Sequence, residues 1–177
     1  STSYGASIKR SKKLANALRK LGVNSYDRVA TIAWNNSRHF ETYFAVSGMG
    51  AILHTLNPRY SPDQLIYILN HAEDELLIVD PTFIPLVESV QDKLDTVKTI
   101  IIASSKDKIP ENNLKNALSY DELIQDESDE FDWPNVNEND AASLCYTSGT
   151  TGNPKGVLYS HRSTILHATS ISGALGF

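Results

Sequence analysis

The residues with the clearest chemical pattern run from Thr147 to Gly156 and read TSGTTGNPKG. Four hydroxyl side chains stand beside two glycines, and a lysine follows three residues after the second glycine. Small residues let backbone N–H groups approach an anion closely, hydroxyls add donors, and lysine supplies a point charge for phosphate. Charge-assisted hydrogen bonds are worth about 1.5–3 kcal/mol each, so several that converge on a polyphosphate can offset the cost of ordering a glycine-rich loop. The run therefore predicts a phosphate-binding loop.

This loop differs from a Walker A loop. Lys155 falls six positions after Gly149, as that motif requires, but Pro154 replaces the second glycine and Gly156 replaces the Ser or Thr that would hold magnesium. Residues 157–159 also have the pattern of a strand rather than the helix that a Walker loop opens. A flexible Ser/Thr/Gly linker would explain the glycines, but it would not explain the Pro-Lys-Gly sequence or the apolar strands on either side.

Other residues that could do chemistry carry weaker signals. The spacing of His39, His54, His71 and His167 is not typical of a metal site. Cys145 lies in an apolar stretch, where a small buried residue is the default. It is the single cysteine, so an internal disulfide is excluded.

The composition is that of a soluble globular protein and argues against a nucleic-acid partner. Of the 177 residues, 41% are hydrophobic and 21% are charged, and the formal net charge is −5. The most apolar stretch, residues 45–56, is too short and too interrupted to span a bilayer, so no transmembrane segment is predicted. The N-terminus has no signal-peptide pattern. These features predict a cytoplasmic protein.

Two charge clusters are predicted to be solvent-exposed rather than functional. Six of the sixteen Lys and Arg residues lie within residues 9–20, where an apolar stripe predicts an amphipathic helix with a basic outer face. The run DESDEFD at residues 126–132 concentrates carboxylates that repel one another. This repulsion favours a solvated linker over a metal site or a site for a cationic partner.

The elements that must position the loop alternate between strand and helix patterns. Strands are expected at residues 28–34, 51–56, 75–79, 97–103 and 141–146. Helices are expected at residues 7–21, from a cap at Ser37 to Gly48, from Ser61-Pro62 to His71, and at 82–94 and 119–125. Short apolar strands separated by helices predict an α/β fold with a largely parallel sheet flanked by helices on both faces.

The same pattern suggests three segments. Residues 1–125 would form an N-terminal α/β subdomain, residues 126–140 an acidic linker, and residues 141–177 a strand, the phosphate-binding loop, a second strand and a helix. The third segment would begin the rest of a nucleotide-binding domain.

The run TSGTTGNPKG resembles, over its whole length, the phosphate-loop signature of adenylate-forming enzymes. This superfamily includes acyl-CoA synthetases, luciferases and peptide-synthetase adenylation domains. Three segments are similar to its fatty acyl-CoA synthetase, or AMP-binding, branch: Val157–Arg162 (VLYSHR), Val23–Asn36 with YDRVA at Tyr26–Ala30, and Leu56–Arg59 (LNPR). Tyr26 departs from the glycine that the family often has there, at a turn.

The resemblance implies a two-step acid–thiol ligase. A carboxylate attacks the α-phosphate of ATP to give an acyl-adenylate and pyrophosphate, and the thiol of CoA then displaces AMP. ATP and CoA would be bound, with Mg²⁺ neutralising phosphate charge. By similarity, Thr147 is the best candidate for contact with the magnesium–phosphate unit, and the other loop-lining residues are Ser148, Gly149, Thr150, Thr151, Gly152 and Lys155. His161 is a candidate substrate-lining residue, with a capping or packing role as the alternative.

The family's later motifs do not occur before Phe177, so the resemblance implies an incomplete large N-terminal domain of an acyl-CoA synthetase. We expect no catalytic residue within these 177 residues, no ligase activity of the chain alone, and self-association, for example as a homodimer, through exposed apolar surface. Three other hypotheses remain open at this point: an amino-acid-activating adenylation domain, a non-catalytic nucleotide-binding module, and an interaction domain.

Overall fold

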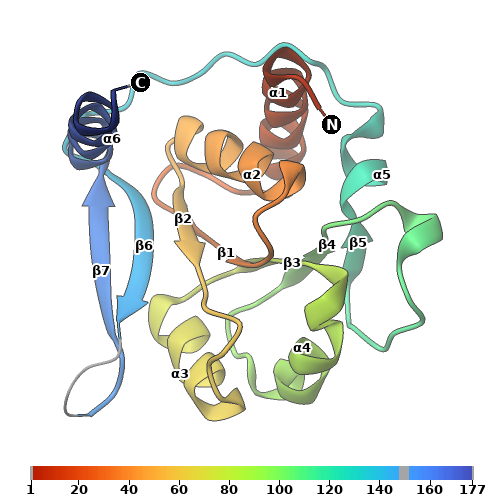
Figure 1. Cartoon of the computed structure of the whole chain (residues 1–177). Coiled ribbons are helices and arrows are strands. Elements are labelled where there is room, and N and C mark those ends of the chain that lie inside the picture. The colour runs from red at the N-terminus through yellow and green to blue at the C-terminus, as the bar shows by residue number, and fades with distance from the viewer. Residues whose placement is uncertain (1, 148–151, 177) are drawn as a thin grey trace.

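The computed structural model describes residues 2–147 and 152–176, which form one mixed sheet with helices on both faces (Figure 1). The strands, in the sheet order β5-β4-β3-β1-β2-β6-β7, pair in parallel throughout except for the antiparallel β6–β7 hairpin. Their bounds are β1 (Arg28–Ile32), β2 (Ile52–Thr55), β3 (Leu76–Val79), β4 (Thr99–Ile102), β5 (Ala117–Ser119), β6 (Ala141–Thr147) and β7 (Lys155–Ser160). The predicted α/β class and largely parallel sheet are confirmed.

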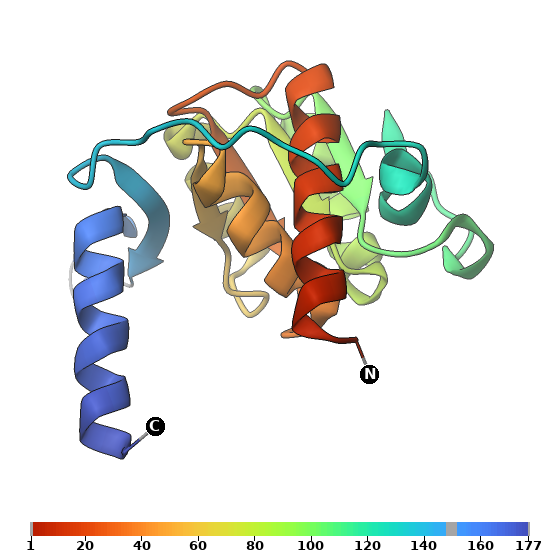
Figure 2. The same cartoon turned by 90° about the horizontal axis from the view of Figure 1, so that it is seen from above.

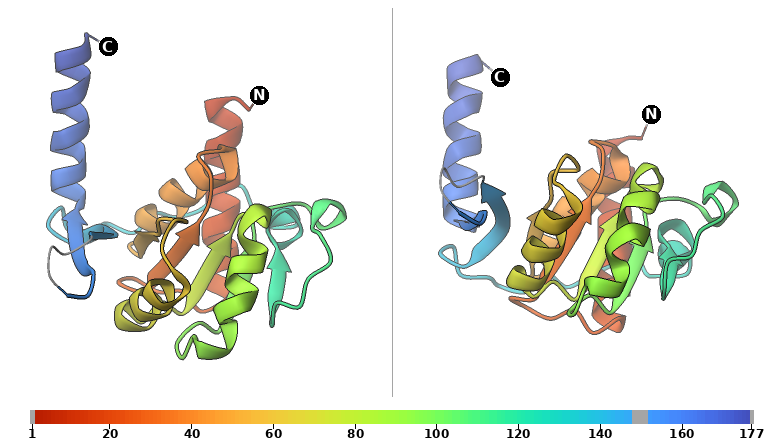
Figure 3. Two further views of the ribbon diagram at one scale, coloured as in Figure 1. Left: turned by 60° about the horizontal axis from the view of Figure 1, so that its bottom comes forward. Right: turned by 90° about the horizontal axis from the view of Figure 1, so that it is seen from below.

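Helices cover the two faces of the sheet unequally. The α-helices are α1 (Tyr4–Lys20), α2 (Ser37–Gly48), α3 (Pro62–Ala72), α4 (Ile84–Val90), α5 (Tyr120–Gln125) and α6 (His161–Leu175). Three short 3₁₀ helices are η1 (Pro81–Phe83), η2 (Gln91–Lys93) and η3 (Lys106–Lys108). Helices α1, α2 and α5 pack on one face and α3 and α4 on the other, as the views from above and below show (Figures 2 and 3).

Successive side chains of each strand face opposite sides of the sheet, so the protein has two separate hydrophobic cores. Val29 of β1 faces the core under α1 and α2, while its neighbour Ala30 faces the core over α3 and α4, and both are fully buried. Successive side chains point to opposite sides of a strand. A parallel sheet covered on both faces therefore needs apolar residues at nearly every strand position, as in the LLIV sequence of β3.

Local sequence signals set most helix ends. Helix α3 begins with a capping box, in which the Ser61 hydroxyl accepts from the Gln64 backbone N–H and the Gln64 side chain accepts from the Ser61 N–H. Helix α1 ends before Gly22, whose φ of +94° is the left-handed conformation expected there. The predicted cap at Ser37 is wrong: Asn36 caps α2 by accepting from the His39 N–H, and asparagine is as good a cap as serine.

Two other expectations need correction. The helix expected at residues 82–94 is divided into η1, α4 and η2. Pro85 has no N–H to donate to the residue-81 carbonyl, so it is accommodated in the first turn of a new helix at Ile84. Strand β5 was not expected, because it has only three residues and its central Leu118 is partly exposed at the edge of the sheet.

The two charge clusters of the sequence lie against each other. The segment after α5 crosses α1 on its way to β6 (Figure 2), and three lysines of α1 pair with its acidic residues: Lys9–Asp129, Lys12–Glu130 and Lys20–Glu127, at 2.8–3.0 Å. The expectation that both clusters would simply face solvent was therefore incomplete. Exposed pairs of this kind contribute less than about 1 kcal/mol each, and the Asn16 amide supplies a more specific contact by donating to the carbonyls of Ser128 and Glu130.

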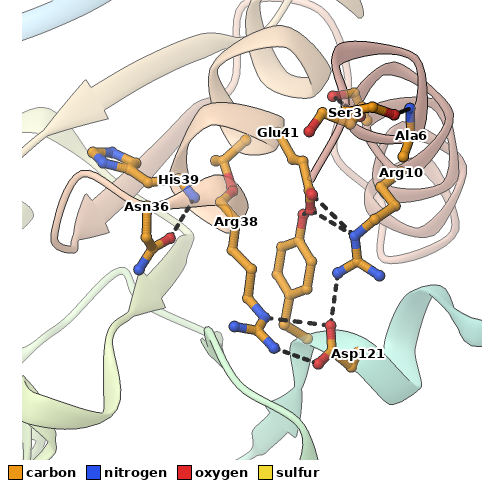
Figure 4. Close-up of polar contacts among 12 residues, drawn as sticks. Ser3, Ala6, Arg10, Asn36, Arg38, His39, Glu41 and Asp121 are labelled. Carbon is orange, nitrogen blue, oxygen red and sulfur yellow. Dashed lines mark hydrogen bonds and ion pairs between the residues drawn. The ribbon is translucent and has the colours of Figure 1, made fainter. Parts of the chain in front are cut away.

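A partly buried ionic network joins α1, α2 and α5 (Figure 4). The Arg10 guanidinium donates to both oxygens of Glu41 at 3.0 Å and to Asp121 at 2.7 Å, and Arg38 donates to Asp121 at 2.6 Å. The Tyr120 hydroxyl donates to Glu41 at 2.8 Å. Glu41 and Tyr120 are almost fully buried, and burial raises the pKa of Tyr120 well above its ordinary value. Charged groups at this depth are stable only when paired.

Replacing Glu41 with glutamine should destabilise the fold by about 2–4 kcal/mol, because it leaves the Arg10 charge without its buried partner. Glu130→Gln is the matched control, since Glu130 also pairs with a cation but is 83% exposed, and it should cost less than about 1 kcal/mol. Urea unfolding monitored by circular dichroism measures both. Equal effects of the two changes would contradict this account of the network.

The ion pairs of Asp121 also predict a pH dependence. Burial alone raises the pKa of this carboxyl, but hydrogen bonds from Arg38 and Arg10 outweigh burial and lower the pKa below its ordinary value. The stabilisation is therefore complete above the unfolded pKa of about 3.9 and is lost as pH falls through the lower folded value. The difference in unfolding free energy between the protein and Asp121→Asn should shrink between about pH 5 and about pH 2.5. A constant difference over this range would rule out the ion pairs as its source.

Candidate phosphate-binding site

The predicted loop connects the two strands of the β6–β7 hairpin. Thr147 is the last residue of β6 and Lys155 the first of β7, and they are partners in the antiparallel register. Four predicted ligands, Ser148, Gly149, Thr150 and Thr151, lie outside the described residues. The hairpin thus brings the first hydroxyl and the lysine of the motif to the same end of the sheet.

Most of the described residues of the loop are open to solvent, although Pro154 is buried. Thr147, Gly152 and Lys155 are exposed, and Gly152 has a φ of +92°, with open space where a Cβ would stand. Among the described residues, the Lys155 ammonium has no ion-pair partner. A cationic side chain beside an exposed hydroxyl can bind an anion without first breaking an internal ion pair.

The two strands of the hairpin are packed tightly next to the loop. Across the ladder from Tyr146 stands Gly156, and a Cβ on Gly156 would lie 3.2 Å from atoms of the Tyr146 ring and from Leu144. The Tyr146 hydroxyl lies 2.6 Å from Nδ1 of His71 in α3, and the Tyr60 hydroxyl donates to the Tyr146 carbonyl at 2.8 Å. These tyrosine and histidine contacts were not anticipated, because no spacing rule links residues so far apart in the chain.

A fully buried pair lies under the same strand. His54 Nδ1 is 2.7 Å from Asp74 Oδ2, both side chains have no exposed surface, and the His54 ring lies 5.2 Å from the Tyr146 ring. Burial raises the pKa of Asp74, and the hydrogen bond with His54 offsets part of that rise. Burial, followed by the nearby Asp74 carboxyl, raises the pKa of Tyr146 to about 12, so its hydroxyl stays protonated at neutral pH.

His161 lies at the opposite end of the hairpin from the loop. Its backbone N–H donates to the Asp140 carbonyl next to the start of β6. The six residue steps of β6 from Ala141 to Thr147 separate the two ends by roughly 20 Å. The structure therefore does not bring His161 together with the phosphate loop. The cap of α6 is Ser160, whose hydroxyl accepts from the Ser163 N–H.

The side chain of His161 lines an apolar cavity of about 550 Å³ between α2 and the start of α6. Phe40, Tyr43 and Phe44 of α2 face it from the other side. The Nε2 atom of His161 is buried and has no hydrogen-bond partner among the described residues. A substrate-lining role for His161 stays a prediction, and it would concern an apolar group distant from the phosphates.

The described part of the chain lacks a metal cluster and a membrane-spanning helix. No group of three or more His, Cys, Asp or Glu side chains could hold a metal ion. None of the described helices has the length and apolar character needed to cross a membrane.

The chain matches the family described as AMP-binding enzyme over residues 1–176. The protein belongs to this family. The match extends from α1 through α6 and so covers the sheet and the loop together, not only the motif. The resemblance inferred from the sequence is confirmed at this level.

The curated relatives of the chain include CoA ligases. The chain is 50% identical to a medium-chain-fatty-acid–CoA ligase from Ectopseudomonas oleovorans over 90% of its own length, and 48% identical to a 3-methylmercaptopropionyl-CoA ligase from Ruegeria lacuscaerulensis over 94%. It is 47% identical to a long-chain-fatty-acid–CoA ligase from Thermus thermophilus over 97%. The chain spans about 30% of the length of these relatives: 29%, 31% and 30% respectively.

Solved structures of CoA ligases contain the same fold. The anthranilate CoA ligase AuaEII in complex with anthranoyl-AMP superposes with a TM-score of 0.84 and 27% identity, over 93% of this chain and 30% of that one. A long-chain-fatty-acid-CoA ligase, FadD1, from Archaeoglobus fulgidus gives a TM-score of 0.82 and 28% identity, over 96% of this chain and 32% of that one. The sheet with helices on both faces is therefore part of a larger known architecture.

The tight contact at Gly156 allows a direct test of the packing between β6 and β7 next to the loop. Gly156→Ala places a methyl group against a Tyr146 ring that its bond with His71 holds in place, so we expect a loss of about 1–3 kcal/mol in unfolding free energy. Gly5→Ala in α1 is the control, because its added methyl meets no atom within 4 Å and helix propensity favours alanine. Thermal unfolding compares the two variants. If Gly156→Ala is as stable as Gly5→Ala, the packing of Gly156 against Tyr146 is looser than the structure indicates.

Proposed function

We propose that the chain forms part of an ATP-dependent carboxylic acid–CoA ligase that acts through an acyl-adenylate, that it has no ligase activity alone, and that residues 147–156 hold the β- and γ-phosphates of ATP. Membership of the AMP-binding family, together with relatives that are CoA ligases at 47–50% identity, supports the reaction type. The single observation that carries the proposal for the loop is the pairing of Thr147 with Lys155 at the exposed end of the hairpin.

The two half-reactions balance without an added oxidant or reductant. In the first, a carboxylate oxygen bonds to the α-phosphorus and the bond to the pyrophosphate leaving group breaks. In the second, the CoA sulfur bonds to the acyl carbon, AMP leaves, and the thiol proton is released. The loop would stabilise the negative charge that leaves with pyrophosphate, which is the usual task of preorganised cationic and hydrogen-bonding groups in such transfers.

Among the residues that the structure describes, we assign three to phosphate binding. The Lys155 ammonium would neutralise phosphate charge, the Thr147 hydroxyl would reach the magnesium–phosphate unit, and the backbone at Gly152 would approach an oxygen closely. An exposed hydroxyl is a hard oxygen ligand of the kind that Mg²⁺ prefers. The remaining loop contacts are proposed from the motif, at Ser148, Gly149, Thr150 and Thr151.

The nature of the acid follows from the relatives alone. Two of the three relatives named above are fatty-acid–CoA ligases and the third is a 3-methylmercaptopropionyl-CoA ligase, so we propose a fatty acid as the substrate class. We propose a cytoplasmic location and self-association for the protein as well. Exposed apolar residues on β7, such as Leu158 and Tyr159, support self-association.

Lys155→Ala should weaken binding of magnesium tripolyphosphate by about 10- to 100-fold, the loss expected for one charge-assisted contact. Lys108→Ala is the matched control, because Lys108 is also exposed but lies in η3, beyond the β4–β5 edge of the sheet. Titration followed by nuclear magnetic resonance of backbone amides measures both affinities. An unchanged affinity in Lys155→Ala would refute the phosphate role of this residue.

A further inference from the structure

The pairing between β2 and β6 stops just before the phosphate loop begins. The last partners in this parallel ladder are Thr55 and Cys145. After Thr55 the Leu56 N–H donates to the Thr31 carbonyl of β1, and residues 57–59 donate no backbone hydrogen bond to the described part of β6. The next carbonyl of β6 is that of Tyr146, and the Tyr60 hydroxyl donates to it at 2.8 Å. A side chain thus takes the place of the missing ladder bond.

The side chain of the same residue is held from α3. The Tyr146 hydroxyl lies 2.6 Å from His71 Nδ1, and the His71 ring is itself stacked on Tyr67 at a centroid distance of 5.2 Å. Tyr146 is therefore fixed at both its carbonyl and its hydroxyl, by residues 86 and 75 positions away in the chain.

Tyr146 in turn contacts both arms of the loop. It is bonded directly to Thr147, the first residue of the motif, and its ring packs against Gly156, the neighbour of Lys155. A shift of the ring would move Thr147 along β6 and open the contact with β7. Phosphate affinity depends on how well donors are held in place, since misplaced groups lose most of their benefit.

We infer that Tyr60, His71 and Tyr146 form a stem anchor, a set of positioning residues that hold Thr147 and Lys155 in the geometry that binds polyphosphate. The stem anchor does not touch the phosphates itself. This inference rests on the proposed phosphate-binding function, and it adds that helix α3 and the turn before it control the loop.

The test removes single hydroxyl groups. Tyr60→Phe and Tyr146→Phe each delete one hydrogen bond of the stem anchor and keep the ring, and each should weaken binding of magnesium tripolyphosphate by about 3- to 10-fold. Tyr67→Phe is the matched control on α3, the helix that carries His71, because its ring still stacks on His71. Unlike the hydroxyls of Tyr60 and Tyr146, that of Tyr67 makes no hydrogen bond within residues 2–147 and 152–176. This variant should bind as the unaltered chain does.

Two further comparisons separate positioning from general stability. His71→Gln, which retains a polar group near the Tyr146 hydroxyl, should recover part of the affinity that His71→Ala loses. In a Lys155→Ala background, Tyr60→Phe should cost little further affinity, because the contact that it positions is already absent. A purely structural role of Tyr60 would lower the melting temperature while leaving the affinity unchanged, and that result would overturn the inference.

A ligand-free readout keeps the two proposals distinguishable. Amide hydrogen exchange at Thr147 and at residues 155–157 should be faster in Tyr60→Phe and Tyr146→Phe than in Tyr67→Phe, whether or not phosphate binds. If Lys155→Ala leaves the affinity intact while exchange rises in Tyr60→Phe and Tyr146→Phe, the proposed phosphate function fails. The stem anchor is then supported only as a support of the hairpin. If Lys155→Ala loses affinity while both tyrosine variants match Tyr67→Phe in affinity and exchange, the stem anchor fails alone.

Discussion

Strand β6 pairs with two strands that run in opposite directions, and the arrangement of the candidate site depends on this pairing. On one side it continues the parallel sheet through β2, and on the other it forms an antiparallel hairpin with β7. The parallel pairing ties β6 to a core that is buried on both faces, while the hairpin extends beyond the helices that cover that core. Thr147, Gly152 and Lys155, which flank the rest of the loop, are therefore exposed to solvent at the end of a packed hairpin. An anion-binding loop needs this combination, because its donors must be accessible and yet held in position.

The helices α1, α2 and α5, which cover one face of the sheet, are joined to one another by ion pairs. Arg10, Glu41 and Asp121 join three helices through charges that are largely removed from water, so each depends on its partners. The lysine–carboxylate pairs between α1 and the segment at residues 127–130 are much more exposed and contribute little individually. Their collective effect is to guide this segment across α1, which delivers the chain from the β5 edge of the sheet to β6 at the other side.

The sequence could predict what depends on short-range patterns. The alternation of apolar strands and capped helices predicts the sheet, because strand propensity and capping are local. The phosphate role of the motif at residues 147–156 also follows from local residue types, and it stays a prediction. The sequence could not predict β5, with its exposed Leu118, or the break before Ile84 that depends on where Pro85 falls in the first turn. It also could not predict that the basic face of α1 meets the acidic segment, since charge runs do not encode their partners.

The residues that hold the loop are the clearest case of this limit. A tyrosine after a proline turn and a histidine near a helix end look unremarkable in sequence, and their importance arises only when β2 and β6 become neighbours. Helix α3 then acts as a fixed support: Leu65, Ile68 and Leu69 bury its inner face against the sheet, and the capping box fixes its first turn. Because His71 lies on this helix and Tyr60 just precedes it, the packing of an apolar core is connected through two hydroxyl groups to the geometry of a polar loop. The chemistry of the site is thus encoded locally, whereas its precision is encoded in contacts between residues far apart in the chain.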